Sequence, residues 1–238
     1  MNEAIKKRIS HRCFSNEPVS SSDVLQIQKW IAEANEESGL DIEYLSDGSE
    51  AFNGIKKSYG MFSNVRSMFL MKGCSNDENL DVKIGYYGED LVLKMTQLNL
   101  GTCWVGGTYD SSSFAVPDGK NLICVIVFGN IQKSIKDVLI RAAIRSKNRK
   151  GIEERVIADA KLPEEVSTGM EAGRLAPSAV NRQAPTLHYV HRQISMDVDA
   201  SVKFNLVDLG IAMRHFEIGA GVGRFELPLQ VGITLETA

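Results

Sequence analysis

Three short hydrogen-bonding side chains follow a proline near residue 177 and could bind a ligand. A helical pattern of apolar residues stops at Ala176-Pro177, because proline disfavours helix for the residue before it. Ser178, Asn181 and Gln183 come directly after this stop, where we expect a surface turn. Turns held by a rigid element are where binding groups concentrate. The segment is therefore a candidate binding turn, with a plain helix-to-strand connection as the alternative.

Two basic motifs could bind a phosphate. Arg8, Ser10 and Arg12 alternate near the start of the sequence, and in an extended segment they would lie on one face. Arginine suits a phosphate because its planar fork donates two parallel hydrogen bonds. Lys147 and Arg149 form a second basic run. The alternative for the first motif is a solvated, basic start of the chain.

A glycine pair closes the stretch Leu100–Gly107, after a long apolar helical pattern. Glycine lets the backbone approach a ligand closely, so Gly106 and Gly107 are candidate binding positions. The alternative is a glycine-rich turn after a helix that ends at Gly101.

Other chemistry finds little support in the sequence, and no metal site is expected. The four cysteines are far apart and are read as small buried hydrophobes in a reducing compartment. His188 and His191 would face opposite sides of a strand. Ser178 lacks the Gly-x-Ser-x-Gly setting of a serine nucleophile. The glycines of 219–223 follow a helix instead of a strand, which argues against a dinucleotide fingerprint.

Composition indicates a globular protein. The chain has 238 residues, of which 43% are hydrophobic and 24% charged, with a net charge of −3. Because no long basic run is present, nucleic acid is not an expected partner. No apolar stretch long enough for a signal peptide or a membrane span is visible, so we expect a cytoplasmic protein without a membrane partner.

The elements that must position these residues fall into two unequal halves. The first half is expected to contain helices at 2–8, from 21–23 to Gly39 and at 87–100, strands near 41–45, 67–72 and 121–128, and an extended segment at 152–157. The second is expected to contain helices at 163–176 and 205–218, and strands at 186–190 and near 229–235. The two long helices align with an offset of 118 residues, which pairs Asp90 with Asp208. This alignment favours two related halves packed as a pseudo-dimer.

Taken in order, the motifs resemble those of the FMN-dependent nitroreductase family. The resemblance rests on Ala-Pro-Ser-x-x-Asn at 176–181, Arg-x-Ser-x-Arg at 8–12, the stretch 100–107 and Lys-x-Arg at 147–149. In that family the turn normally occurs early in the chain, whereas here it comes in the second half. Two departures are Gly106, where many relatives have an acidic residue, and Gln183-Ala184-Pro185, which replaces Gln-Pro-Trp.

The resemblance implies a set of FMN-binding residues. It implies that Arg8, Ser10, Arg12, Lys147 and Arg149 bind the phosphate, that the amides of Gly106 and Gly107 face flavin N5 and O4, and that Pro177, Ser178, Ala179 and Asn181 lie against the flavin. It also implies an α+β fold with a mixed, mainly antiparallel sheet flanked by helices and two pseudo-symmetric halves.

The division of the motifs predicts that each half contributes a different part of the FMN site. Residues 1–158 would form a nitroreductase-like half with the phosphate site, and residues 159–238 a second half with the turn. The chain resembles single-chain nitroreductases, which predicts one FMN per chain and a monomer that is an internal pseudo-dimer.

The implied function is an FMN-dependent oxidoreductase. NADH or NADPH would give hydride to flavin N5 and leave, and a small-molecule electron acceptor such as a nitroaromatic or a quinone would then take its place. No protein nucleophile is required, because the cofactor carries the chemistry. The alternatives are a non-catalytic or degenerate FMN-binding protein, and another flavin reaction on the same fold.

Overall fold

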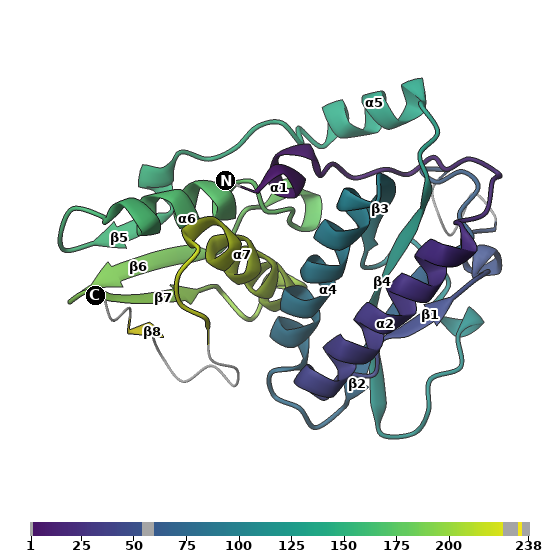
Figure 1. The fold of residues 1–238 in the computed structure, drawn as a ribbon, viewed down its shortest axis with the longest axis horizontal. Coiled ribbons are helices and arrows are strands. Elements are labelled where there is room, and N and C mark those ends of the chain that lie inside the picture. Colours follow the sequence, from purple (N-terminus) through teal and green to yellow (C-terminus); the bar gives the residue numbers. More distant parts are fainter. Residues whose placement is uncertain (1, 54–59, 226–232, 235–238) are drawn as a thin grey trace. The chain divides into compact units, whose positions relative to one another are not determined.

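The computed structural model describes residues 2–53, 60–225 and 233–234 (Figure 1). The chain divides into two compact units. We call residues 7–80 and 91–145 the N-terminal unit, and residues 1–6, 81–90 and 146–238 the C-terminal unit. The boundary thus lies near residue 145, and the first unit is interrupted by part of a helix. The division into nitroreductase-like halves at residue 158 stays a prediction.

The N-terminal unit is built on an antiparallel sheet. Its strands, in the order β1-β2-β4-β3, are β1 (Glu43–Leu45), β2 (Met68–Cys74), β4 (Lys120–Asn130) and β3 (Leu100–Val105). The middle of β4 is apolar and buried from Cys124 to Phe128, as expected for a strand covered on both faces. One face packs on a cluster that includes Phe14, Phe52 and Met68.

Local sequence signals determine the ends of α2 (Ser21–Ser38). The Ser20 hydroxyl accepts a hydrogen bond from the Asp23 N–H at 3.1 Å, which caps the start of the helix. Gly39 ends it in the left-handed conformation with φ 71°, which glycine adopts without strain. The predicted helix and its end at Gly39 are confirmed, but its N-cap is Ser20 and the predicted cap Ser21-Ser22-Asp23 forms its first turn. In Figure 1 the helix lies beside β1 and β2. The remaining short elements of this unit are η1 (Ser49–Phe52), η2 (Ser111–Ser113) and α5 (Ile135–Ala143).

The C-terminal unit has its own mixed sheet. Its strands follow the order β5 (Val156–Ala158), β6 (Thr186–Val190), β7 (Gln193–Asp197) and β8 (Ile233–Thr234), and only β5 and β6 run parallel. Helices α6 (Glu164–Arg174) and α7 (Asn205–Ala220) pack against each other, and α7 contacts β7. The unit also contains η3 (Ile152–Glu154), η4 (Ala179–Asn181) and most of α1 (Glu3–Lys7). Together the two sheets and their helices confirm the α+β fold.

Two glycines allow α4 (Leu80–Gln97) and α7 to cross at close range. A Cβ atom on Gly85 would lie 2.0 Å from the Val207 carbonyl oxygen, and one on Gly210 would lie 2.0 Å from the Val82 carbonyl oxygen. The two contacts are reciprocal, since 82 and 85 correspond to 207 and 210 with the same offset of 125. The crossing therefore has a local two-fold relation, at a register different from the predicted offset of 118.

The same local symmetry relates two polar side-chain pairs, one buried and one partly exposed. The His215 imidazole lies 2.8 Å from the Glu89 carboxylate, and neither side chain is exposed. The counterpart pair is Asp90 with Arg214, whose guanidinium donates through Nε at 2.9 Å and through Nη2 at 2.5 Å. Since both pairs join α4 to α7, they hold the register that the glycines permit.

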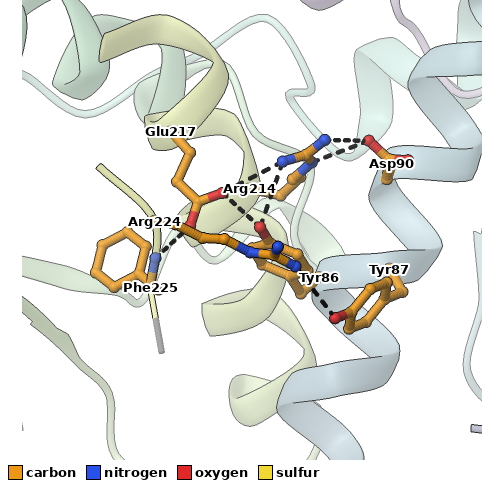
Figure 2. Close-up of polar contacts among 7 residues, drawn as sticks. All are labelled: Tyr86, Tyr87, Asp90, Arg214, Glu217, Arg224 and Phe225. Atoms are coloured by element: carbon orange, nitrogen blue, oxygen red, sulfur yellow. Dashed lines mark hydrogen bonds and ion pairs between the residues drawn. The ribbon is translucent and has the colours of Figure 1, made fainter. Parts of the chain in front are cut away.

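Figure 2 shows how this contact continues to the chain that follows α7. The Tyr86 hydroxyl donates to the Glu217 carboxylate at 2.5 Å, and the Phe225 N–H donates to the same carboxylate at 2.5 Å. Burial and the Glu217 hydrogen bond raise the pKa of Tyr86, so its hydroxyl remains a donor. Arg214 also contacts Tyr86 and Glu217, each at 3.3 Å. These polar groups form hydrogen bonds with one another inside the protein, which indicates a structural role for the network.

Several predicted elements need correction. The helix expected at 87–100 begins earlier, at Leu80, and ends at Gln97. Gly101 does not stop it, because Asn99 turns the chain in the left-handed conformation with φ 60° and Gly101 lies within β3. Helix α5 and the strands β3 and β7 were not predicted. The predicted C-terminal strand is described only at Ile233–Thr234, and its other residues lie outside the described part of the chain.

Candidate functional site

The basic motif 8–12 lies along the edge of β3 in the N-terminal unit. Ser10 pairs with Thr102 as an isolated parallel bridge, and the His11 N–H donates to the Thr102 carbonyl at 2.8 Å. Because β3 is an edge strand, its free hydrogen-bonding groups are available to receive this segment. The segment is therefore extended at Ser10, as its alternating pattern predicted.

A buried carboxylate on α5 fixes the end of this segment. The Arg12 N–H donates to both oxygens of Asp137, at 2.9 and 3.2 Å, and only 2% of Asp137 is exposed. Arg141, one helical turn further, lies 3.5 Å from the Asp137 carboxylate and donates to the Ser10 carbonyl at 3.2 Å. Helix α5 thus anchors the motif through two residues that the sequence reading missed.

The result is a concentration of positive charge around the motif. The pKa of His11 is lowered mainly by burial; Asp137 opposes this, and Arg141, Arg8 and Arg12 add to the lowering. Three guanidinium groups therefore act on this position against one carboxylate. The Nη1 atom of Arg12 is buried and has no hydrogen-bond partner within the described residues. A buried guanidinium nitrogen without an acceptor fits an anionic ligand such as a phosphate.

The glycine pair follows β3 directly, on the strand that carries the basic motif at its edge. A Cβ atom built on Gly107 would meet nothing within 4 Å. The φ angle of Gly107 is not in the left-handed region, so its backbone does not require glycine. The space above Gly107 is open within the described residues, which is compatible with a planar ligand lying against the backbone.

The turn after α6 belongs to the C-terminal unit and has unusual backbone geometry. Three of its residues are in the left-handed region: Val180 with φ 48°, Asn181 with φ 57° and Gln183 with φ 53°. For residues other than glycine this conformation is uncommon, and for β-branched valine it is a true outlier. The Val180 side chain is 76% exposed at the tip. Strained, exposed turns of this kind are typical of functional sites.

Side chains from the preceding segment hold the turn. The Arg149 guanidinium donates to the carbonyls of Ala176 and Leu175 at 2.9 and 3.3 Å, and to Asn181 Oδ1 at 3.3 Å. Asn181 Nδ2 and Gln183 Nε2 both donate to the Asn148 carbonyl at 3.0 Å. Arg149 and the polar side chains of the turn thus stabilise one another.

The turn also closes on itself. The Ser178 hydroxyl accepts a hydrogen bond from the Gln183 N–H at 2.9 Å. Two predicted ligand-binding groups, Ser178 and Asn181, therefore make hydrogen bonds inside the protein. The parts of the turn that remain for a ligand are the ring of Pro177, the side chain of Ala179 and the exposed side chain of Val180.

A second buried carboxylate, Asp208 in the first turn of α7, lies against this turn. Both of its oxygens accept from the Ala179 N–H, at 3.0 and 3.1 Å, and Asp208 is 3% exposed. Burial raises its pKa to about 7, although the Ala179 hydrogen bond and the charge of Arg182 act in the opposite direction. No sequence signal identified Asp208 as a partner of the turn, because its neighbour is 29 residues away.

The structure thus groups the predicted residues within each unit. Arg8, Ser10 and Arg12 lie on one segment beside the strand that leads to Gly106 and Gly107. Arg149, Pro177, Ser178, Ala179 and Asn181 lie together in the other unit, whereas the Lys147 side chain is exposed. No group of three or more His, Cys, Asp or Glu residues in the described ranges could hold a metal ion. No described helix has the length and apolar character of a membrane span.

Comparison with solved structures shows the fold. A protein of Thermotoga maritima described as a "putative nitroreductase" superimposes with a TM-score of 0.59 at 23% identity, over 91% of this chain and 82% of that one. An "FMN-dependent Nitroreductase" of Clostridium difficile R20291 matches with a TM-score of 0.47 at 18% identity, and the match covers 56% of this chain and 89% of the Clostridium chain. A "Nitroreductase with Bound FMN" of Bacteroides fragilis has a TM-score of 0.44 at 16% identity, and the match covers 57% of this chain and 95% of the Bacteroides chain.

Sequence comparison identifies the family. No curated protein matches the chain significantly. The model of the family described as "Putative TM nitroreductase" matches residues 1–220, and so covers most of the 238 residues, including the basic motif, the glycine pair and the strained turn. The chain belongs to this nitroreductase family.

Proposed function

We propose that the protein is an FMN-dependent oxidoreductase that uses NADH or NADPH to reduce small electron-poor molecules, such as nitroaromatics or quinones. Membership of a nitroreductase family supports the reaction class. The names of similar structures, which mention FMN dependence and bound FMN, are consistent with the cofactor. The order of motifs along the chain supports the same assignment.

The observation that carries the proposal is the basic segment beside β3. Arg12 presents a buried Nη1 without a hydrogen-bond partner in the described residues, next to the charges of Arg8 and Arg141. A phosphate would supply acceptors for the guanidinium and offset the excess charge. The Ser10 hydroxyl, on the same segment, can donate a further hydrogen bond to a phosphate oxygen. Lys147 and Arg149 are proposed to add charge to this phosphate, as the family resemblance implies.

The remaining residues would orient the ring system. The N–H groups of Gly106 and Gly107 are proposed to donate to the N5 and O4 edge, where negative charge develops on reduction. Pro177, Ala179 and the backbone beside Ser178 and Asn181 would lie against the flavin. FMN, when bound, supplies the two-electron chemistry through N5. The protein would contribute binding, orientation and backbone donors, and no side chain is proposed as a nucleophile.

The visible spectrum of the purified protein tests this function most directly. After reconstitution with FMN, the protein should show flavin absorption bands that NADH or NADPH bleaches in the absence of oxygen. Addition of a nitroaromatic or a quinone should then restore the bands. Flavin that binds but is not reduced would instead indicate a non-catalytic FMN-binding protein. Failure to bind FMN would overturn the proposal.

A further inference from the structure

We propose that Asp208 is a positioning residue that clamps the strained turn 176–183 in its ligand-binding shape. The inference rests on the proposed function, because it takes this turn as part of the flavin site. Asp208 itself would not touch the flavin. It would act through the backbone of Ala179, one of the residues proposed to lie against it.

The first argument is that the turn needs an external clamp. Val180, Asn181 and Gln183 are held in the left-handed region, which is unfavourable for residues other than glycine. Such a conformation persists only when surrounding contacts over-determine it. Arg149 holds the beginning and Asn148 the end of the turn, but both act from the same preceding segment.

The second argument is the position of the carboxylate. Asp208 reaches the turn from α7, and both of its oxygens lie within hydrogen-bond distance of the Ala179 N–H, directly before Val180. A second contact ties the two segments together, since Arg182 Nη1 donates to Asn205 Oδ1 at 2.6 Å. The start of α7 therefore holds the turn before and after the strained pair Val180-Asn181.

The third argument is that a buried carboxylate at this place calls for an explanation. Asp208 is 3% exposed and forms no ion pair within the described residues, where its hydrogen-bond donor is the Ala179 N–H. Burying an ionisable group with so few partners is unfavourable. The charged group that faces it is Arg182, whose guanidinium is bound to Asn205. The ionised carboxylate is the stronger acceptor, so the clamp should tighten as Asp208 loses its proton near neutral pH.

Hydrogen exchange of the flavin-free protein tests the clamp without relying on the cofactor. The protection factor of the Ala179 amide should rise between pH 6 and pH 8 in the native chain. In Asp208→Asn it should be about three- to tenfold lower at pH 8 and nearly independent of pH, because a neutral amide accepts more weakly. Glu165→Gln is the matched control, since it removes an exposed carboxylate from α6 in the same unit.

Binding of FMN and of riboflavin, which lacks the phosphate, then separates positioning from phosphate binding. Asp208→Asn should weaken both ligands by a similar factor at pH 8, because the turn is proposed to contact the ring system. A loss confined to FMN would contradict the proposal. Equal Ala179 protection in the native chain and Asp208→Asn at every pH would also overturn it. If the native chain binds neither flavin, the proposed function fails, while the exchange experiment still reports on the clamp.

Discussion

At the scale of single residues, the two arginines of the basic motifs occupy different environments. Arg12 has a buried nitrogen without a hydrogen-bond partner in the described residues, beside two further guanidinium groups. Arg149 donates to two backbone carbonyls and to Asn181. The first environment suits an incoming anion, and the second maintains a turn. The same residue type therefore has two different roles.

Arg12→Met should weaken FMN at least about tenfold and leave riboflavin affinity unchanged, because a charge-assisted phosphate contact is worth about 1.5–3 kcal/mol. Flavin fluorescence titration measures both constants. Arg66→Met, which removes an exposed arginine of the same unit, is the control and should not change either affinity. A parallel loss of riboflavin binding would show that Arg12 acts on the ring site or on folding instead of on the phosphate.

Gly107→Ala tests whether a ligand occupies the open space beside the glycine pair. The added methyl group meets no protein atom and the backbone is unstrained, so thermal stability should stay unchanged or rise slightly. FMN affinity or flavin reduction should nevertheless fall, because the methyl group would separate the backbone from the ring. Gly119→Ala is an informative contrast: it also has open space, but its φ of 77° makes alanine destabilising. Normal binding and reduction in Gly107→Ala would contradict the placement.

At the scale of elements, the crossing of α4 and α7 depends on backbone proximity. Gly85 and Gly210 each face a carbonyl oxygen of the opposite helix, and the ion pairs of Glu89 and Asp90 follow one turn later. Close helix contact lets both carboxylates reach their partners on α7. The glycines therefore determine how near the helices come, and the ion pairs determine their register.

Gly210→Ala should destabilise the protein by about 1–3 kcal/mol or more, because the new Cβ atom would lie 2.0 Å from the Val82 carbonyl oxygen. Chemical denaturation measures the loss. The matched control is Gly173→Ala in α6, where the nearest atom is the Ala212 carbonyl oxygen at 3.7 Å and alanine favours helix. A Gly210→Ala protein as stable as the Gly173→Ala protein would refute the close crossing.

At the scale of the whole molecule, the buried carboxylate Asp208 links stability to pH. Its pKa is about 7 in the folded protein against an ordinary value near 4, so the folded state binds this proton more tightly. The corresponding stability is full below about pH 4 and is lost as pH rises through about 7. The loss of stability does not conflict with a stronger Ala179 hydrogen bond. Ionisation of Asp208 strengthens that one contact, but it also places a charge in a buried site, which lowers the free energy of unfolding.

Asp208→Asn should therefore remove a pH-dependent part of the unfolding free energy. Between pH 4 and pH 7 the difference in stability should shift progressively in favour of the variant, since the native chain alone loses the contribution. Urea denaturation at several pH values gives the two curves. Glu165→Gln serves again as the control, and its curve should follow that of the native chain. Parallel curves for Asp208→Asn and the native chain would exclude the linkage.

The number of flavins bound per chain tests the prediction that the phosphate residues and the turn serve the same FMN. The proposed phosphate residues Arg8 and Arg12 belong to one compact unit, and the turn 176–183 to the other. The family resemblance predicts that one FMN uses both sets, so titration should saturate at about one equivalent per chain. Saturation near two equivalents, or tight binding by residues 1–158 alone, would contradict this prediction.

The sequence alone determined features that depend on neighbouring residues. Gly39 ends α2 where capping preferences place it, and Pro177 ends the helical pattern before the turn. The alternation of Arg8, Ser10 and Arg12 indicated an extended basic segment, and the order of motifs identified the family that the comparisons confirm. These signals are readable because each rests on contacts within a few residues.

Only the tertiary structure decided which distant groups meet. The helix register shows this most clearly: offsets of 118 and 125 differ by seven residues, about two helical turns, so both present nearly the same apolar face. The apolar pattern could not distinguish these two offsets, whereas the pairs Glu89–His215 and Asp90–Arg214 determine one register. The partners Asp137 and Asp208 were equally hidden, because each carboxylate receives a backbone N–H from a segment far away in the chain. Backbone donors carry no sequence signature, so only the fold reveals what they bind.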